Sequence, residues 1–459
     1  MKSLLIGGDR SGSGKTSITL AIASLLSRDR EVQTYKVGMD YIDPSYLTGV
    51  TGRWCRNLDS FVMDPDDLSM IFDHARRGAD VALVEGVRGL YEGAEPLTDA
   101  GSTASVAKAL HLPVVLVINA RSITRSAAAM VKGFAAFDPE VDIAGVILNN
   151  IAGDRHRDKA VRAVEHACGI PVVGAIPRSD EMALAMRHLG LVPFREGEQG
   201  TAFRQRIDAI PKIIGEHLDL DLLLDIAADR GPPVRESFLD HQPDPDIRIG
   251  VACDEAFNFY YADLFDVLRS AGAEPVAFSP IHDRLPPADG YILGGGYPEM
   301  HAGALEANGE MREAIRETAE SRVPVYAECG GLAYLTGRIE LAAGFGGIDE
   351  ARSFEMCGVF DGTTRMPSRR VLGYVAGECT VDHPFAGGAF RGHEFHYSDV
   401  DLPDDTRFAY RLSRGSGIRG SLDGAISGQT LASYIHLHPV TSREIFSGFV
   451  ASCRMQAGV

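Results

Sequence analysis

The sequence predicts an α/β protein with two doubly wound units in one chain. Short apolar, β-branched runs alternate with longer amphipathic stretches, and this alternation stops and then restarts near residue 240. Each half also contains a glycine-rich turn directly after an apolar run. Continuous apolar strands separated by helices are typical of a parallel sheet that is covered on both faces. At 459 residues, the chain has room for two large domains or three smaller ones.

The first half contains six apolar runs that we predict to be strands. Amphipathic stretches between them predict helices, for example over residues 16–27 and 122–134. The predicted strands cover residues 3–7, 32–37, 81–85, 113–119, 143–149 and 171–176.

The alternation breaks over residues 225–247, where Pro232, Pro233, Pro243 and Pro245 lie among charged residues. This composition is typical of a linker. We therefore predict a first domain over residues 1–228, a linker over 229–246 and a second domain over 247–459. The strands predicted in the second domain cover residues 248–252, 274–278, 290–293 and 323–327.

The composition narrows the class of protein. A net charge of −18 argues against nucleic acid or an anionic membrane as the main partner, because both attract basic surfaces. The seven cysteines are odd in number and form no CxxC pair, which fits a reducing compartment rather than a disulfide framework. No apolar run reaches the roughly 18 residues of a membrane helix, and Leu4-Leu5-Ile6 leads directly into a glycine turn rather than a cleavage site. We expect a soluble, cytoplasmic protein.

The first glycine-rich turn has the composition of a phosphate loop. Leu4-Leu5-Ile6 is followed by GDRSGSGKT (residues 8–16) and then by a helical pattern. Glycines let backbone N–H groups face phosphate oxygens, the lysine binds the outer phosphates, and the threonine binds Mg²⁺. Asp9 stands where the usual pattern has its first glycine, and the longer spacing resembles that of dethiobiotin-synthetase-type ATPases. The loop residues predicted to bind ATP are Gly8, Gly12, Ser13, Gly14, Lys15 and Thr16.

Three acidic residues lie near the ends of predicted strands, where the ligand sites of α/β sheets gather. Asp40 and Asp43 follow the strand that contains Lys36, and Glu85 closes an apolar strand. We expect these four charged residues to be catalytic. In this interpretation Thr16, Asp43 and Glu85 hold Mg²⁺, and Lys36 neutralises an acyl phosphate. Each aspartate taken alone also fits a turn or a helix cap.

Asn149 closes a further predicted strand in the same half. Its carboxamide has the donor and acceptor needed to read the adenine edge of ATP. A role in a turn is an equal alternative.

The second glycine-rich turn, in the other half, places Cys329 between an apolar strand and a helical pattern, in the sequence AECGG. A helix N-terminus lowers the pKa of a thiol, and the nearby amides can hold an oxyanion. Gly330, together with Gly295 and Gly296 of the upstream LGGGYPE turn, is predicted to form that oxyanion hole. A chain with both sites suggests an ATP-driven ligase that makes its own ammonia.

The thiol needs a base, and His436 in SYIHLHP is the candidate. A rival interpretation joins His436 and His438 with His393 and His396 of GHEFH into a metal site. No cysteine or carboxylate completes a familiar ligand spacing around these histidines, so the base is the favoured role.

Taken in order, the motifs resemble the cobyrinic acid a,c-diamide synthase family over nearly the whole chain. Together they are highly specific, whereas any one of them apart from the cysteine turn would be weak. The blocks that carry the resemblance are GDRSGSGKT, YKVGMDYIDPSYLTG, RNLD, EGVRGLYEG, RHLGLVP, DEAFNFYY, LGGGYPEMHA, AECGGLAYL, GHEFHYS and SYIHLHP.

The resemblance implies an N-terminal ATP-dependent synthetase fused to a class I-like glutaminase. It implies that Cys329 is the glutaminase nucleophile and that His436 is its base. Related glutaminases carry a His-x-Glu pair, but this chain has His438 in place of the glutamate. The resemblance therefore implies a Cys–His dyad and leaves open what orients His436.

The family's chemistry implies three substrates: L-glutamine, ATP and a tetrapyrrole polycarboxylate. Glutamine forms a thioester with the cysteine and releases ammonia. ATP converts a substrate carboxylate into an acyl phosphate, and ammonia displaces the phosphate. The cycle runs twice, on the a and c side chains. The oligomeric state stays open, with a homodimer as one candidate.

Two substrate branches exist in this family. One amidates cobyrinate or hydrogenobyrinate for cobalamin, and the other amidates nickel-sirohydrochlorin for the nickel cofactor of methanogenesis. The form EGVRGLYEG departs from the usual cobalamin pattern at Arg88 and Glu92 and looks more like the archaeal branch. We therefore expect nickel-sirohydrochlorin as substrate, with cobyrinate as the alternative. Arg88, Glu92 and Tyr41 of YIDPSY are the predicted substrate-binding residues.

A different class of protein fits part of the pattern. A regulatory phosphate-loop ATPase, akin to partitioning switches, with a decayed glutaminase-like domain would keep Lys15 and would not need Cys329. Such switches often carry a second lysine early in the loop, where this chain has Arg10. A third interpretation is a ligase of the same build that acts on other carboxylates.

Overall fold

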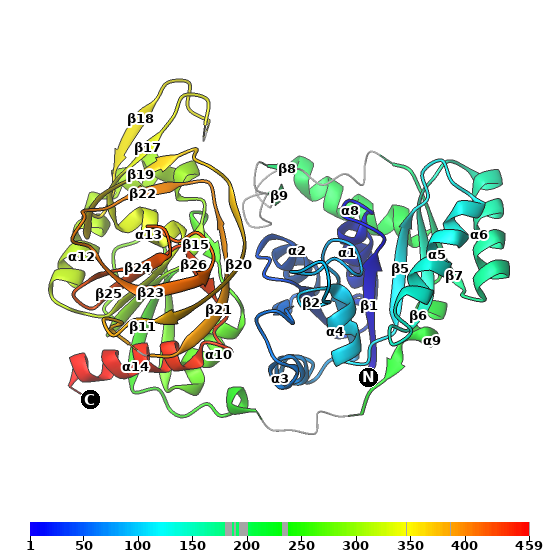
Figure 1. The fold of residues 1–459 in the computed structure, drawn as a ribbon, viewed down its shortest axis with the longest axis horizontal. Coiled ribbons are helices and arrows are strands. Elements are labelled where there is room, and N and C mark those ends of the chain that lie inside the picture. Colours follow the sequence, from blue (N-terminus) through cyan, green and yellow to red (C-terminus); the bar gives the residue numbers. More distant parts are fainter. Residues whose placement is uncertain are drawn as a thin grey trace. The chain divides into compact units, whose positions relative to one another are not determined.

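In the computed structural model, the apolar runs of the first half form one sheet of eight strands (Figure 1). Its order is β3-β2-β4-β1-β5-β6-β7, and all seven of these strands run parallel. The short strand β10 pairs antiparallel with β1. Strands β2 and β4 are buried along their whole length, as expected of a sheet with helices on both faces. The strands are β1 (Lys2–Gly8), β2 (Val32–Val37), β3 (Arg56–Leu58), β4 (Val81–Glu85), β5 (Val114–Asn119), β6 (Ile143–Ile151), β7 (Val172–Pro177) and β10 (Ala228–Asp229).

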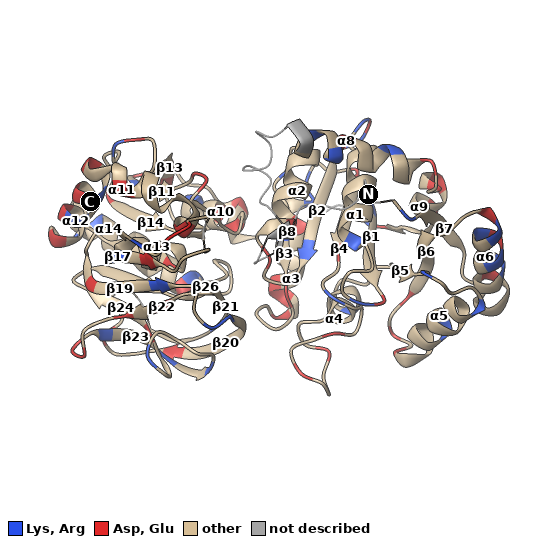
Figure 2. Ribbon diagram, turned by 90° about the horizontal axis from the view of Figure 1, so that it is seen from above, with Lys and Arg blue, Asp and Glu red and all other residues tan. Residues whose placement is uncertain are grey.

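Local signals explain where the helices of this half begin and end. The Asp64 side chain accepts from the Asp67 amide at the start of α3, which has proline at its first position, and α6 ends at Gly169 in the left-handed conformation. Acidic and basic residues are interspersed along α6 (Figure 2). The helices are α1 (Lys15–Leu26), α2 (Ile42–Thr51), α3 (Pro65–Ala75), α4 (Thr103–Ala109), α5 (Arg125–Phe137), α6 (Asp154–Cys168), α8 (Thr201–Gly215) and α9 (Leu220–Ile226), and the strands β8 (Met186–Arg187) and β9 (Gly190–Leu191) form a separate pair.

The six strands predicted in the first half are all present, each within two residues of its expected ends. The helix predicted at 16–27 is α1, and the helix predicted at 122–134 is α5, which begins three residues later. The edge strand β3 was missed because its three residues, Arg56–Leu58, are too short to show a periodic pattern.

The structure describes residues 1–179, 186–187, 190–191, 201–231, 237–345, 347–385 and 387–458. The chain divides into two units, Met1–Ser237 and Phe238–Val459. This division falls within the stretch 229–246 predicted as a linker, although Pro232 and Pro233 lie outside the described residues. The block RHLGLVP at 187–193 also lies partly outside them.

The second unit contains a ten-stranded mixed sheet in the order β13-β11-β14-β16-β25-β24-β23-β20-β21-β26. The strands from β13 to β25 are parallel, and each later neighbour pairs antiparallel. A four-stranded sheet (β18-β17-β19-β22) and the pair β12-β15 complete the unit. The strands are β11 (Ile247–Ala252), β12 (Phe257–Phe259), β13 (Ala273–Phe278), β14 (Gly290–Leu293), β15 (Gly295–Gly296), β16 (Val325–Glu328), β17 (Thr336–Leu341), β18 (Arg352–Glu355), β19 (Phe360–Met366), β20 (Val371–Cys379), β21 (Ala389–His396), β22 (Asp399–Asp401), β23 (Arg407–Arg414), β24 (Leu422–Ser427), β25 (Thr430–Ser433) and β26 (Ile435–Leu437).

Helices of the second unit pack against this sheet. The ring of Tyr326 on β16 lies 5.3 Å from the ring of Phe446 on α14, measured between centroids, so the C-terminal helix packs on the central strand. The helices are α10 (Asp263–Ser270), α11 (Ala302–Ala307), α12 (Gly309–Glu320), α13 (Gly330–Leu335) and α14 (Arg443–Ala457), with the short 3₁₀ turns η2 (Phe238–Asp240) and η3 (Pro298–His301).

The expectation of a doubly wound second unit is right only for its parallel part. The four predicted strands are β11, β13, β14 and β16. The antiparallel strands were missed because exposed residues interrupt the buried ones, as Arg411 and Ser413 do on β23, and because all but one residue of β20 is exposed or half-buried. Such strands give a weaker apolar signal than the fully buried strands of a parallel sheet.

Two consecutive strands lie at separate places in the ten-stranded sheet. β25 ends at Ser433 and β26 begins at Ile435, yet β25 pairs with β16 whereas β26 pairs with β21 at the end of the strand order. A single residue, Tyr434, therefore connects a strand in the middle of the sheet order, β25, to the strand at its end, β26.

No helix in the described part of the chain is long and apolar enough to cross a lipid bilayer.

Two candidate catalytic sites

The phosphate loop joins β1 to α1, as the sequence predicts. Gly12 and Gly14 have φ values of 74° and 96°, a left-handed region that favours glycine. Gly14 is also the residue that precedes the first turn of α1. The first backbone N–H groups of a helix have no intrahelical acceptor, so this turn is a ready anion site.

Lys15 lies at the first position of α1 and is 7% exposed. Its ammonium donates to the backbone oxygens of Arg10 (3.4 Å) and Arg88. Burial and the nearby charge of Lys36 lower the pKa of Lys15 to about 8. A nearby anion favours the protonated amine and so offsets both causes, which suits Lys15 to receive phosphate oxygens.

Lys36, Asp43, Glu85 and Thr16 form one compact cluster in the first unit. The Lys36 ammonium lies 2.6 Å from Asp43 Oδ2 and 2.8 Å from Glu85 Oε1. The Thr16 hydroxyl donates to Glu85 Oε1 at 2.7 Å and to Asp43 Oδ2 at 3.3 Å. Lys36 and Glu85 are direct partners in the register between β2 and β4, which explains why these two strand ends bring their side chains together.

Burial shifts the pKa values of charged residues in and beside this cluster. Burial raises the pKa of Glu85, and burial together with Asp43 raises the pKa of Asp40 to about 7. Burial alone would lower the pKa of Lys36, but the charges of Asp43 and Glu85 outweigh it and hold the ammonium protonated. Asp40 Oδ1 accepts from the amides of Ile42 (2.8 Å) and Asp43 (3.2 Å), which is the turn geometry that the sequence left open for it.

The donor set fits Mg²⁺. Glu85 is fully buried, and its Oε2 atom has no hydrogen-bond partner among the described residues. Mg²⁺ prefers oxygen ligands, and it usually takes one or two carboxylates together with substrate phosphates. Thr16, Asp43 and Glu85 supply one hydroxyl and two carboxylates beside the phosphate loop.

Asn149, near the end of β6, forms a hydrogen bond to the phosphate loop. Its Nδ2 atom donates to the Ser13 backbone oxygen at 2.8 Å, and its Oδ1 atom accepts from the Asn150 amide at 2.8 Å. Both ends of the carboxamide therefore have protein partners here, and a contact with adenine stays a prediction.

Two of the three predicted substrate residues, Arg88 and Glu92, lie on a segment beside the phosphate loop. Tyr41 is buried at the start of α2. The segment that holds Arg88 and Glu92 packs against the loop, since the Leu90 amide donates to the Gly8 backbone oxygen at 2.8 Å. Arg88 and Glu92 are both exposed, and Arg88 has a positive φ of 48°. Their contact with substrate stays a prediction.

Cys329 occupies the sharp turn between β16 and α13. Its backbone has φ 48° and ψ −95°, a strained conformation for a residue with a side chain, and its amide donates to the Ser433 backbone oxygen at 2.7 Å. The residue is 8% exposed, and its sulfur lies 3.5 Å from the Phe395 backbone oxygen. The predicted cysteine turn is therefore present, and it places the thiol beside the GHEFH segment.

The three predicted oxyanion-hole glycines lie together beside the thiol. A Cβ on Gly330 would lie 3.1 Å from the Gly296 amide nitrogen, and a Cβ on Gly295 would lie 2.6 Å from His436 Cε1. Gly330 opens α13, so its amide lies in the first turn, where N–H groups lack intrahelical acceptors. Any side chain on Gly295 would displace the imidazole ring.

His436 is fully buried on β26. Burial lowers the pKa of its imidazole, but hydrogen bonding and charge from Cys329 and Glu328 outweigh burial and raise the pKa to about 10. A protonated imidazole beside a thiol stabilises the thiolate, which is the nucleophilic form. The structure thus brings together the cysteine and the histidine that the sequence predicts as nucleophile and base.

Glu328 was missed as a site residue. The sequence implied a dyad, yet Glu328 Oε2 lies 3.3 Å from His436 Nδ1. A signal was available, because a charged side chain that closes an apolar strand needs a partner. The same signal had pointed to Glu85.

The remaining histidines do not complete a metal site. His438 pairs with Asp263 at 3.4 Å, and the ring of His396 stacks on Tyr434 at 3.7 Å between centroids. His393 faces His436 across β21 and β26, with ring centroids 5.8 Å apart. In the described ranges, no three His, Cys, Asp or Glu side chains are arranged to hold a metal ion.

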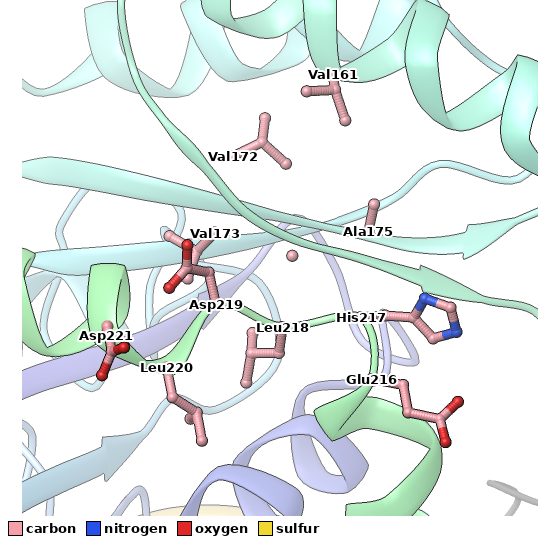
Figure 3. A pocket seen from close by; sticks show the side chains of 11 residues that line it. Val161, Val172, Val173, Ala175, Glu216, His217, Leu218, Asp219, Leu220 and Asp221 are labelled. Atoms are coloured by element: carbon pink, nitrogen blue, oxygen red, sulfur yellow. The ribbon is translucent and has the colours of Figure 1, made fainter.

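A hollow of about 710 Å³ lies in the first unit, along β7 and the turn between α8 and α9 (Figure 3). It shares no lining residue with either catalytic cluster. The lining residues are Val161, Val172, Val173, Gly174, Ala175, Glu216, His217, Leu218, Asp219, Leu220 and Asp221.

Two family models match the chain, one in each unit. Residues 4–192 match the CobQ/CobB/MinD/ParA nucleotide binding domain, and residues 248–443 match the CobB/CobQ-like glutamine amidotransferase domain.

Similar proteins cover nearly the whole chain. A cobyrinate a,c-diamide synthase of Methanosarcina acetivorans is 48% identical over 97% of this chain and 94% of its own length. Those of Methanothermobacter thermautotrophicus (46%, covering 97% of this chain and 98% of the relative) and Listeria monocytogenes (41%, covering 95% and 96%) are also similar. With this identity over both units, the chain belongs to the cobyrinate a,c-diamide synthase family.

Proposed function

We propose that the protein is a carbon–nitrogen ligase that takes ammonia from glutamine and, with ATP, amidates the a- and c-acetate carboxylates of cobyrinate or hydrogenobyrinate. One observation carries this proposal: a single chain holds both the compact cluster of Thr16, Lys36, Asp43 and Glu85 beside the phosphate loop and the Cys329–His436 pair. The first cluster suits the transfer of a phosphoryl group, and the pair suits the hydrolysis of an amide. Relatives that cover nearly the whole chain carry the matching name.

The thiol site would release ammonia from glutamine. The Cys329 thiolate attacks the carboxamide carbon, and the amides near Gly296 and Gly330 stabilise the oxyanion. His436 gives its proton to the leaving amine, so ammonia departs and a thioester remains. His436 then takes a proton from water, which attacks the thioester and releases glutamate and the thiol.

The phosphate site would activate the carboxylate. A substrate carboxylate oxygen attacks the γ-phosphorus of ATP, ADP leaves, and an acyl phosphate forms. Lys15 binds the outer phosphates, and Lys36 neutralises charge on the transferred group. Mg²⁺ held by Thr16, Asp43 and Glu85 would supply further charge neutralisation. Ammonia then attacks the acyl carbon, expels phosphate and leaves the amide.

The proposal reverses the order of substrates that the sequence favoured. The motif EGVRGLYEG led us to expect nickel-sirohydrochlorin, but the names of the similar proteins support cobyrinate. Nickel-sirohydrochlorin is the second candidate. The exposed Arg88 beside the phosphate loop supports it, because a cation there distinguishes this chain from the usual cobalamin pattern.

The test is mass spectrometry of the product formed by the pure protein with ATP, Mg²⁺ and glutamine. Cobyrinate and nickel-sirohydrochlorin are offered separately and then in competition. Two added amides and a preference for cobyrinate are expected. A preference for nickel-sirohydrochlorin would transfer the same residue roles to the second candidate. ATP hydrolysis that ignores glutamine and both tetrapyrroles would favour the regulatory ATPase.

A further inference from the structure

We propose that Glu328 is the positioning residue of the thiol site, which makes the site a Cys–His–Glu triad whose acid directly precedes the nucleophile in the chain. This inference rests on the glutaminase activity proposed above. The usual position of the acid, two residues after the histidine, is occupied by His438.

The contacts of Glu328 support a fixed orientation. Oε1 accepts from the Tyr326 hydroxyl at 2.6 Å and from the Leu437 amide at 3.1 Å, while Oε2 faces His436 Nδ1 at 3.3 Å. One carboxylate therefore binds both the backbone next to His436 and the imidazole itself. Glu328 is 8% exposed and His436 is fully buried, so water competes little for these bonds.

The tautomer of His436 follows from this contact. A carboxylate beside Nδ1 keeps the proton on that nitrogen, as in other histidine–carboxylate pairs. Nε2 is then the nitrogen that exchanges a proton with the Cys329 sulfur and the leaving ammonia. Without the carboxylate, the ring can adopt the other tautomer, which cannot act as the base.

Other buried acids in this unit are engaged elsewhere. Both oxygens of Glu394, on neighbouring β21, accept from backbone amides, those of Ser416 (2.8 Å) and Gly417 (2.6 Å). Asp263 Oδ2 on α10 lies 3.4 Å from His438 Nε2, and both of these side chains are fully buried. The unit thus has two histidine–carboxylate pairs, and the Asp263–His438 pair provides a matched control.

The decisive experiment compares Glu328→Gln with Asp263→Asn in the full-length protein. Glutamate release from glutamine is measured from pH 6 to 10.5. For Glu328→Gln we expect kcat to fall about 100-fold, within the range of a general acid–base contribution, while KM changes less than about threefold. Asp263→Asn is expected to stay near the wild-type rate.

The pH dependence of kcat/KM distinguishes a positioning role of Glu328 from a role in folding alone. The titratable groups that face His436 are Cys329 and Glu328 at the cysteine turn, and His393 and His396 on β21. Because Glu328 helps to raise the pKa of His436, its neutralisation lowers that pKa. The imidazolium is the form that donates to the amine, so the alkaline fall in kcat/KM moves to lower pH in Glu328→Gln.

Glu328→Asp keeps the charge but shortens the side chain by one methylene. It is expected to recover part of the lost rate and to keep the alkaline limb nearer the wild-type position. If Glu328→Gln does not fold, the aspartate variant decides the question by its rate and by the pH dependence of Cys329 alkylation with iodoacetamide. Cys329→Ala gives the background from the other six cysteines.

The proposal would be overturned if the Glu328 variants kept wild-type rates and an unshifted alkaline fall in kcat/KM. It would also be overturned if that alkaline fall shifted in Asp263→Asn instead. A failure of the proposed function looks different, because wild-type protein would then release no glutamate at all. In that case the alkylation profiles still report whether Glu328 controls the Cys329–His436 pair.

Discussion

The two candidate sites differ in how far neighbouring groups compensate for the burial of charge. In the phosphate site, Asp43 and Glu85 hold Lys36 protonated, but burial lowers the pKa of Lys15 to about 8 and raises that of Asp40 to about 7, so the charged forms of these two residues are disfavoured. In the thiol site, Cys329 and Glu328 outweigh burial and hold His436 protonated. The difference indicates that Lys15 in the first site needs an incoming anion, whereas the charged side chains of the second site already compensate one another.

The largest effect is expected from Cys329→Ala. Glutamine-dependent amidation should fall by at least about 1,000-fold, as for removal of a catalytic nucleophile. Ammonia-dependent amidation should remain, because the phosphate site does not use the thiol. Product mass spectrometry with glutamine or with ammonium chloride measures both, and loss of both activities would mean that the two sites do not divide the work.

Lys15→Ala should give the reverse pattern. Removal of the cation should lower amidation from either nitrogen source by about 100- to 1,000-fold, since it stabilises developing phosphate charge. Glutamate release should survive in part. Lys108→Ala is the control, because Lys108 forms ion pairs with Asp99 and Asp138 instead. Undiminished product from ammonia in Lys15→Ala would show that the loop is not the ATP site.

Gly295→Ala tests whether the thiol site is as rigid as its contacts indicate. The new methyl would lie 2.6 Å from His436 Cε1, so the imidazole must move. A displaced base should lower glutamate release about 10- to 100-fold. Gly373→Ala, on β20, meets no atom within 4 Å and should be neutral. If both variants hydrolyse glutamine equally well, the thiol site is not preorganised in the way that its contacts indicate.

The charge state of Lys15 should be visible in nucleotide binding. At pH 9 the amine is mostly neutral because its pKa is about 8, and bound phosphate raises that pKa. Binding of a non-hydrolysable ATP analogue should therefore take up a proton, in a pH window that begins near 8 and closes where the bound amine loses its own proton. Titration calorimetry in two buffers of different ionisation enthalpy measures this uptake. The uptake should vanish at pH 6.5 and in Lys15→Met.

Asn149→Ala is expected to have the smallest effect. Loss of the bond to the Ser13 backbone oxygen should cost about 1 kcal/mol, or roughly a fivefold rise in the Kd for ATP. If Asn149 only holds the phosphate loop in place, its loss should raise the Kd for ATP and for GTP by the same factor. A change in the preference between these nucleotides would instead assign Asn149 to the adenine edge.

Much of the first unit could be predicted because its signals are local. Fully buried parallel strands read as continuous apolar runs, and the residues that follow them meet at one edge of the sheet. Lys36 and Glu85 illustrate this, since they are register partners on β2 and β4.

The second unit was harder to predict because its site depends on distant pairing. Glu328 and His436 are 108 residues apart, and their contact arises only after β16 pairs with β25. The antiparallel strands around them carry mixed polarity, so their order is set by tertiary pairing that no short pattern encodes. Cys329 and His436 could be named as functional residues from their motifs, whereas Glu328 showed only that it needs a partner, and which residue that partner is depends on the pairing of distant strands.

β16 pairs with β25, which follows it much later in the chain, and this separation has a consequence while the protein is being synthesised. Val325 and Thr430, which begin β16 and β25, are separated by 105 positions, so the ribosome needs roughly 5 to 20 seconds to travel between them. Throughout that time one edge of the nucleophile's strand has no neighbour and the base has not been made. If His436 is the base, as proposed above, a chain truncated before β26 lacks that base and should not hydrolyse glutamine.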